Sequence, residues 1–99
     1  MYFLDFYPEA AADWKATDKS ITAIFLKILK RRLIVPHIPG ARLSGNLRGC
    51  YKISLNKSGY RLIYLVQDEE LRVLIISVGK RENKVAYRLA AQRLQEIRD

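Results

Sequence analysis

The chain has 99 residues, of which 49% are hydrophobic and 28% are charged, and its formal net charge is +8. This composition excludes a disordered tail, and the length suits one modest core, so we expect residues 1–99 to form a single domain. No apolar run is long enough to span a bilayer, and residues 1–14 carry acids where a signal peptide carries cations, so we expect a cytoplasmic protein with no membrane partner.

The first third of the sequence predicts one short strand and two helices. Residues 2–6 are typical of a strand, and Pro8 suits the first turn of a helix that runs towards Trp14. Thr17 or Asp18 can cap a second helix, whose apolar residues share one face: Ile21, Ile24, Phe25, Ile28 and Leu29. We expect these helices to form an antiparallel hairpin that covers a sheet, before a loop containing Pro and Gly ends the second helix.

The remainder of the sequence predicts three strands and a third helix. Alternating segments bounded by turn residues indicate strands at residues 48–55, 60–67 and 71–80. Short turns make these strands an antiparallel meander, which the first strand extends to the four-stranded, mainly antiparallel sheet of an α+β fold. Residues 73–76 are apolar on both faces, so we expect their strand to lie centrally. A final helix over residues 84–98 shows a thin apolar stripe of Val85, Leu89, Leu94 and Ile97.

Positive charge is concentrated in the predicted strands. Ten Lys or Arg residues stand between positions 42 and 88 against four acids, three of which cluster at residues 68–70. Lys52, Arg61 and Arg81 belong to consecutive strands, where an unpaired cation is costly to remove from water. They suggest a missing polyanion, for which nucleic-acid phosphate is the natural candidate, although an acidic protein would satisfy the same charge.

Strand alternation predicts which of these side chains can meet. Lys52 and Ser54 share one face of their strand, and the apolar residues around them share the other. If the apolar set is core, Lys52 and Ser54 face a groove. Arg61 lies just beyond the next turn and Arg81 at the end of the last strand, so both can approach that groove from its rim. Tyr87, one to two turns into the final helix, can close over it.

These segments resemble the RelE toxins of bacterial toxin–antitoxin modules, within the RelE/ParE superfamily. The similar blocks are Cys-Tyr-Lys-Ile-x-Leu at 50–55, Ser-Gly-Tyr-Arg-Leu-Ile-Tyr at 58–64, and Val-Gly-Lys-Arg-Glu at 78–82 followed by Tyr87. The order of elements agrees over nearly the whole chain. The resemblance implies a ribosome-dependent endoribonuclease that cuts messenger RNA in the decoding A site without a metal or other cofactor. It also implies a cognate antitoxin as partner, in a complex that binds operator DNA.

The resemblance assigns the active site to Lys52, Arg61, Arg81 and Tyr87. Metal-free cleavage uses the 2′-hydroxyl as the nucleophile, and Arg61 and Arg81 could bind the phosphate oxygens, with Arg81 stabilising the leaving group. Lys52 and Tyr87 are alternatives for the general base, because neighbouring cations favour a neutral amine and a phenolate alike, and the Tyr87 ring could instead stack on a flipped base. The chain departs from the family at Ser54, where typical members carry a second Lys.

Further residues are candidates for contact with RNA, with an antitoxin or with the core. The candidates for contact with RNA are Ser54, Lys57, Lys80, Lys84 and Arg88, and the cations of the last helix, with Arg93, could serve an antitoxin instead. Arg61 could alternatively pair with the acids at 68–70, and Arg81 with Glu82. The single cysteine, Cys50, suits a small strand residue. His37, the only histidine, lies in a Pro-flanked loop that we expect to be away from the strands.

Two other functions are compatible with such a fold. One is a ParE-like toxin that inhibits gyrase by binding and has no nuclease chemistry, against which the combination of Lys52, Arg61, Arg81 and Tyr87 argues. The other is a non-catalytic RNA-binding module. A module of that kind predicts exposed aromatic residues interleaved with cations on the sheet, whereas the aromatic residues here are predicted to point mostly inward.

Overall fold

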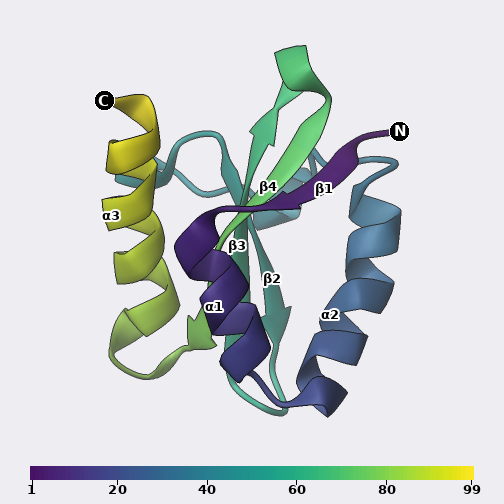
Figure 1. The fold of residues 1–99 in the computed structure, drawn as a ribbon, viewed down its shortest axis with the longest axis vertical. Helices are drawn as coiled ribbons and strands as arrows, with labels where there is room; N and C mark the ends of the chain where they lie inside the picture. The colour runs from purple at the N-terminus through teal and green to yellow at the C-terminus, as the bar shows by residue number, and fades with distance from the viewer.

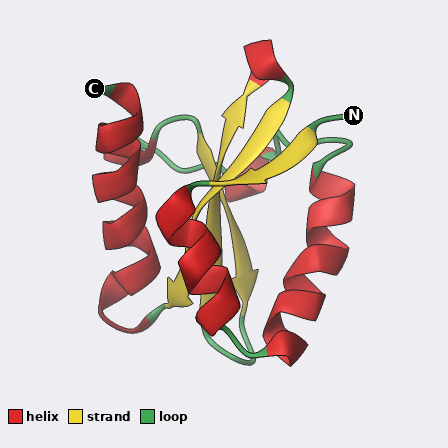
Figure 2. Ribbon diagram, viewed as in Figure 1, coloured by secondary structure: helices red, strands yellow, loops and turns green.

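The computed structural model describes residues 1–99 as four strands and three helices (Figure 1; Figure 2). In chain order they are β1 (Phe3–Phe6), α1 (Pro8–Ala16), α2 (Lys19–Arg32), β2 (Cys50–Leu55), β3 (Tyr60–Gln67), β4 (Arg72–Lys80) and α3 (Val85–Arg98). Of the two predicted caps for the second helix, Asp18 is the one used. Its carboxylate accepts a hydrogen bond from the Ser20 backbone N–H at 2.8 Å. The Ser20 hydroxyl and N–H together lower the pKa of Asp18.

The sheet has the strand order β1-β4-β3-β2. β3 pairs antiparallel with both β2 and β4, which confirms the predicted meander, whereas β1 runs parallel to β4, so the sheet is mixed. β4 lies between β1 and β3, and its residues 73–76 are all buried, as their two-sided apolar character predicted.

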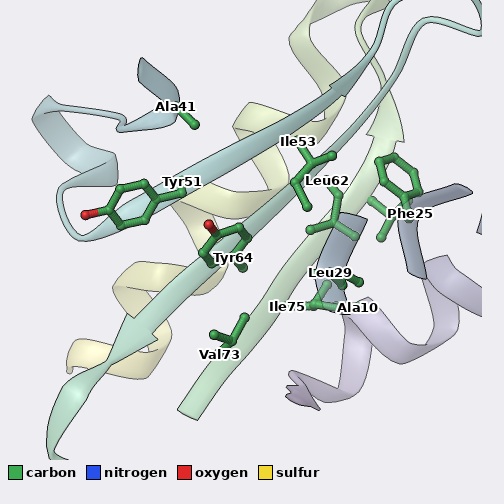
Figure 3. Packing of buried hydrophobic residues seen from close by; sticks show 11 residues of the cluster. Ala10, Phe25, Leu29, Ala41, Tyr51, Ile53, Leu62, Tyr64, Val73 and Ile75 are labelled. Atoms are coloured by element: carbon green, nitrogen blue, oxygen red, sulfur yellow. The ribbon is translucent and has the colours of Figure 1, made fainter. Parts of the chain in front are cut away.

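Helices cover both faces of the sheet. α1 and α2 lie against one face and α3 against the other (Figure 1), so the predicted covering by the helical pair is confirmed. On the first face, α2 packs Phe25 and Leu29 into the cluster that contains Ile53 and Leu62, and α1 adds Ala10 (Figure 3). None of the three helices has both the length and the apolar composition needed to cross a lipid bilayer.

Two details of the predicted helix faces are wrong. Ile24 of α2 is 48% exposed, because the helix presents only Phe25 and Leu29 fully to the sheet. In α3 the apolar stripe is shifted towards the two alanines, whose short side chains let the helix lie close to the strands. Val85 and Leu89 are only partly buried, and the buried residues are Ala86, Ala90, Arg93 and Leu94.

An ion pair between α1 and α3 supplies hydrogen-bond partners to the part of β4 that has no neighbouring strand. β1 pairs only with Arg72–Ile75, so the edge beyond it has no neighbouring strand. There the Arg93 guanidinium donates to the Ile76 carbonyl at 2.9 Å and to the Asp13 carboxylate at 2.6 Å. The same carboxylate accepts from the Val78 N–H at 3.3 Å. Arg93 is therefore part of the core, and the prediction that it serves nucleic acid or an antitoxin is wrong.

A polar network joins the N-terminus, the loop before β2 and the turn between β3 and β4. Asp68 accepts from the Tyr2 hydroxyl at 2.6 Å and lies 2.8 Å from Nε2 of His37. Nδ1 of His37 is 2.8 Å from the Tyr51 hydroxyl on β2. The prediction that His37 lies away from the strands is therefore wrong. Its contact is with the face of β2 that packs under α2, opposite the face that carries Lys52.

This network makes the free energy of unfolding depend on pH in the acid range. The hydrogen bond from Tyr2, and then that from His37, lower the pKa of Asp68 below its ordinary value of 3.8. A lowered folded-state pKa means that the stabilisation is present above about 3.8 and is lost as the pH falls towards the folded-state value. We expect the urea midpoint of the wild type to fall more steeply between about pH 5 and pH 2 than that of Asp68→Asn. Identical slopes for the two proteins would contradict the proposed contribution of Asp68.

Candidate active site

Three of the predicted site residues lie on the sheet face that α3 partly covers. The strand register places Lys52, Ile63 and Ser77 in one row across β2, β3 and β4, and Ser54, Arg61 and Gly79 in the next row. Ile63 belongs to the cluster under α3. Lys52, Ser54 and Arg61 therefore point to the α3 side and are partly exposed, as the alternation of β2 predicted.

Arg61 and Arg81 both lie beside the turn between β2 and β3. Arg61 Nη1 donates to the Tyr60 carbonyl at 3.0 Å, so its guanidinium folds towards that turn. The Arg81 backbone N–H donates to the Gly59 carbonyl at 2.8 Å, which extends the β3–β4 pairing beyond Lys80. A Cβ built on Gly59 would lie 3.8 Å from Arg81 Nε, so the Arg81 side chain lies beside the turn as well. Both guanidinium groups thus stand at the same end of the sheet.

No carboxylate neutralises these cations. The ion pairs of the structure join Arg72 to Asp5 and Arg93 to Asp13, and His37 lies within hydrogen-bond distance of Asp68. The alternative pairing of Arg61 with the acidic turn is wrong, because that turn and Arg61 lie at opposite ends of β3. The alternative pairing of Arg81 with Glu82 is absent within 4.0 Å. Glu82 Oε1 lies beside the same turn as Arg81 but forms no ion pair with it within 4.0 Å, so both guanidinium groups can donate to an oxyanion brought to this end of the sheet.

Tyr87 lies on the side of α3 that faces β2. It packs, partly buried, against the same cluster as Ile63. Arg98 stands eleven residues later, about three helical turns, and so on the same side of the helix. Arg98 Nη2 donates to the Arg48 carbonyl at 2.7 Å, just before β2. This contact shows that the Tyr87 side of α3 faces the strand that carries Lys52.

The remaining predicted contacts with RNA are spread more widely. Lys57 is exposed in the β2–β3 turn, Lys84 is exposed just before α3, and Arg88 is exposed with its Nε donating to the Asn83 carbonyl at 3.1 Å. Lys80 lies on the opposite face of the sheet, where its Nζ is 5.8 Å from the centre of the Tyr60 ring. The structure therefore does not bring Lys80 to the face that carries Lys52 and Arg61.

Three further residues lie in or beneath the strands of this region, and of these only Cys50 was considered from the sequence. Cys50 is fully buried, and burial raises the pKa of its thiol to about 12, so it is no nucleophile. Arg32 of α2 donates to the Lys52 carbonyl at 3.3 Å and to the Tyr64 hydroxyl at 2.8 Å, which ties β2 to α2. Ser77 is fully buried beneath α3. A serine inside an otherwise apolar strand is the signal that could have drawn attention to it.

The sequence is similar to those of bacterial toxins. A family model described as the ParE toxin of the type II toxin–antitoxin system parDE matches residues 4–85. The mRNA interferase toxin RelE of Escherichia coli (strain K12) is 42% identical over 93 residues, which cover 94% of this chain and 97% of the relative.

The fold is also similar to those of solved toxin structures. A variant of the E. coli toxin RelE in the free state superposes with a TM-score of 0.85 at 41% identity, over 93% of this chain and 96% of that chain. A chain of the intact E. coli RelBE toxin–antitoxin complex superposes with a TM-score of 0.77 at 42% identity, over 81% of this chain and 96% of that chain. The fold implied by the sequence resemblance is thereby confirmed.

Proposed function

Because this chain belongs to the RelE toxins of the RelE/ParE superfamily, we propose that it is a ribosome-dependent endoribonuclease that cuts messenger RNA in the decoding A site. The observation that carries this proposal is the set of three cations without carboxylate partners within 4.0 Å, Lys52, Arg61 and Arg81, on or beside the sheet face against which Tyr87 packs. A site of this charge suits a phosphodiester, because the ammonium and guanidinium groups are free to donate to phosphate oxygens.

The proposed reaction is an attack of the 2′-hydroxyl on the adjacent phosphorus. The 2′-oxygen forms a bond to phosphorus as it loses its proton, and the bond to the 5′-oxygen breaks as that oxygen gains one. The products are a 2′,3′-cyclic phosphate and a 5′-hydroxyl. Arg61 and Arg81 bind the non-bridging oxygens and stabilise the doubly charged phosphorane, with Arg81 nearest the leaving oxygen. Lys52 and Tyr87 are the two groups available to accept the 2′ proton.

The shortage of ordinary acids and bases favours a dependence on the ribosome. The only histidine is bound to Asp68 and Tyr51 on the other face, and no carboxylate pairs with the cations of the site. Such a site stabilises negative charge but transfers protons poorly. Its cleavage rate should therefore increase most when the ribosome aligns the 2′-oxygen with the phosphorus.

The proposed partners follow from the same surface. We place the protein in the cytoplasm with translating ribosomes, restrained by a cognate antitoxin, as RelE is found with RelB in the related complex. A net charge of +8 suits an acidic or amphipathic antitoxin segment that folds as it binds. Operator DNA is a further partner of the proposed toxin–antitoxin complex.

The function is tested by adding the protein to a translating extract and mapping the 5′ ends of the messages. We expect cuts in register with codons. The cuts should disappear when ribosomes are prevented from binding the message. They should be unchanged for Lys30→Ala, which removes an exposed cation of α2. The matching family model bears the name ParE, so the alternative is a gyrase inhibitor. Intact messages together with inhibited DNA supercoiling would establish that alternative and overturn the nuclease.

Ser54→Lys should accelerate cleavage roughly tenfold, because one more charge-assisted contact with the phosphorane lowers the barrier by about 1.4 kcal/mol. Ser54 stands directly opposite Arg61, so the added cation reaches the same phosphate. The same opposition of like charges should lower the free energy of unfolding by about 0.2–1 kcal/mol. Single-turnover cleavage on programmed ribosomes measures the rate, with Ser54→Met as a control of similar length. Equal rates for the Lys and Met variants would show that the departure at Ser54 does not limit the reaction.

A further inference from the structure

We propose that Ser77 is a positioning residue for the reaction, because its hydroxyl fixes the first turn of α3 on β4 and so holds Tyr87 on the sheet face that carries Lys52 and Arg61. This inference rests on the proposed nuclease function for its catalytic consequence. Ser77 is fully buried, and its Oγ donates to the Ala86 carbonyl at 2.8 Å. Ala86 is the immediate neighbour of Tyr87, so the bond acts directly on the backbone that carries the tyrosine.

An irregularity in β4 is what turns Ser77 towards α3. The pairing of β3 with β4 shifts by one residue between Ile63 and Tyr64, which leaves Ile76 without a partner on β3. Regular alternation would point Ile76 and Ser77 to opposite faces, but both lie on the α3 side: Ile76 in the cluster beneath the helix and Ser77 bound to Ala86. Bulges commonly re-aim side chains next to functional sites.

Gly79 lets the start of α3 lie close to the strand position opposite Arg61. It follows Ser77 on the same face and pairs with Arg61. A Cβ built on Gly79 would lie 3.5 Å from both the Ala86 backbone nitrogen and Val85 Cγ1, so the first turn of α3 rests directly on this position. The helix start, the Ser77 hydroxyl and Arg61 are thus neighbours on one side of the sheet.

The connection before α3 has an uncommon backbone conformation that depends on contacts around it. Asn83 and Lys84 both adopt left-handed backbone conformations, with φ of 56° and 54°. Non-glycine residues hold such conformations only where surrounding contacts fix them. The other end of the helix is held separately by Arg93 and Arg98. Loss of the Ser77 bond should therefore release the first turn of α3, with Tyr87, while the rest of the helix stays in place.

A double-mutant cycle between Ser77→Ala and Tyr87→Ala tests this role. In the wild-type background, Ser77→Ala should lower kcat about tenfold to thirtyfold with KM changed less than twofold, since it displaces Tyr87 within the site without removing its side chain. In the Tyr87→Ala background the same substitution should change kcat less than about twofold. An equal loss in both backgrounds, or no loss in the wild type, would overturn the proposal.

Thr17→Val is the matched control. Thr17 is buried, and its hydroxyl donates to the Asp13 backbone carbonyl at 2.7 Å within α1. It makes no hydrogen bond to the first turn of α3, so we expect an unchanged kcat. If Ser77→Ala does not fold, Ser77→Cys, which keeps the volume with a weaker donor, goes through the same cycle under the same criteria. If the wild type itself cuts no message, the nuclease proposal fails. The positioning role is then judged by the Tyr87 ring resonances, which should shift in Ser77→Ala and not in Thr17→Val.

Discussion

Arg81→Ala should reduce ribosome-dependent cleavage about 10²–10³-fold, because it removes a preorganised donor to the phosphorane. Its effect on folding should be small, about 0.5 kcal/mol or less, because the side chain is exposed and the structural contact of Arg81 is made by its backbone N–H to the Gly59 carbonyl. Single-turnover cleavage on programmed ribosomes measures the rate, and urea unfolding measures the stability.

The same deletion at Arg61 should produce a comparable loss of rate. Lys30→Ala is the control for a general loss of positive charge, and it should retain the wild-type rate. Ribosome binding by the Arg81 variant should remain within a few-fold of wild type, since most of the basic surface is intact. A variant that lost binding and cleavage in equal proportion would place Arg81 in docking rather than in the chemistry.

Arg93→Met should destabilise the protein by about 3 kcal/mol, at the lower end of the range for breaking a buried ion pair. The side chains of Arg93 and Asp13 are 10% and 19% exposed, so water relieves little of the charge that would be left on Asp13. The substitution also leaves the Ile76 carbonyl without its donor at the edge of β4. For a domain of this size the loss corresponds to a fall in Tm of at least about 12 °C, measured by thermal unfolding.

Two further variants test the reason for that loss. Arg72→Met removes the exposed pair with Asp5, in which the nearest atoms are 3.7 Å apart, and should cost less than about 1 kcal/mol. The double variant Arg93→Met with Asp13→Leu should be more stable than the sum of the single losses predicts, because neither charge is then left unpaired. A loss below about 1 kcal/mol for Arg93→Met would contradict a structural role for the pair.

The features that could be predicted from sequence depend on short-range patterns. Alternation around Lys52 placed that side chain on the correct face, and the apolar run at residues 73–76 placed β4 centrally, because the period of a strand fixes both. Asp18 was among the predicted caps because capping is a local interaction. The grouping of Lys52, Arg61 and Arg81 was predicted from their places in consecutive strands, and the resemblance to the RelE toxins pointed to the same residues.

The features that were missed depend on long-range pairing. The shift in β4 after Ile75 reverses the alternation of the residues that follow, so Lys80 lies over Tyr60 on the opposite face and Ser77 turns under α3. Neither the shift nor the parallel pairing of β1 has a local sequence signal. The role of Arg93 was hidden for the same reason, since its partner Asp13 lies 80 residues away.

The most direct test of the proposed chemistry is the nature of the cut ends. A message cut on programmed ribosomes should carry a 5′-hydroxyl on the downstream fragment and a 2′,3′-cyclic phosphate on the upstream one. The same message with a single 2′-deoxynucleotide at the mapped position should resist cutting, because the nucleophile is gone. A 5′-phosphate on the downstream fragment, or undiminished cutting of the 2′-deoxy message, would contradict cleavage by 2′-hydroxyl attack at the site of Lys52, Arg61, Arg81 and Tyr87.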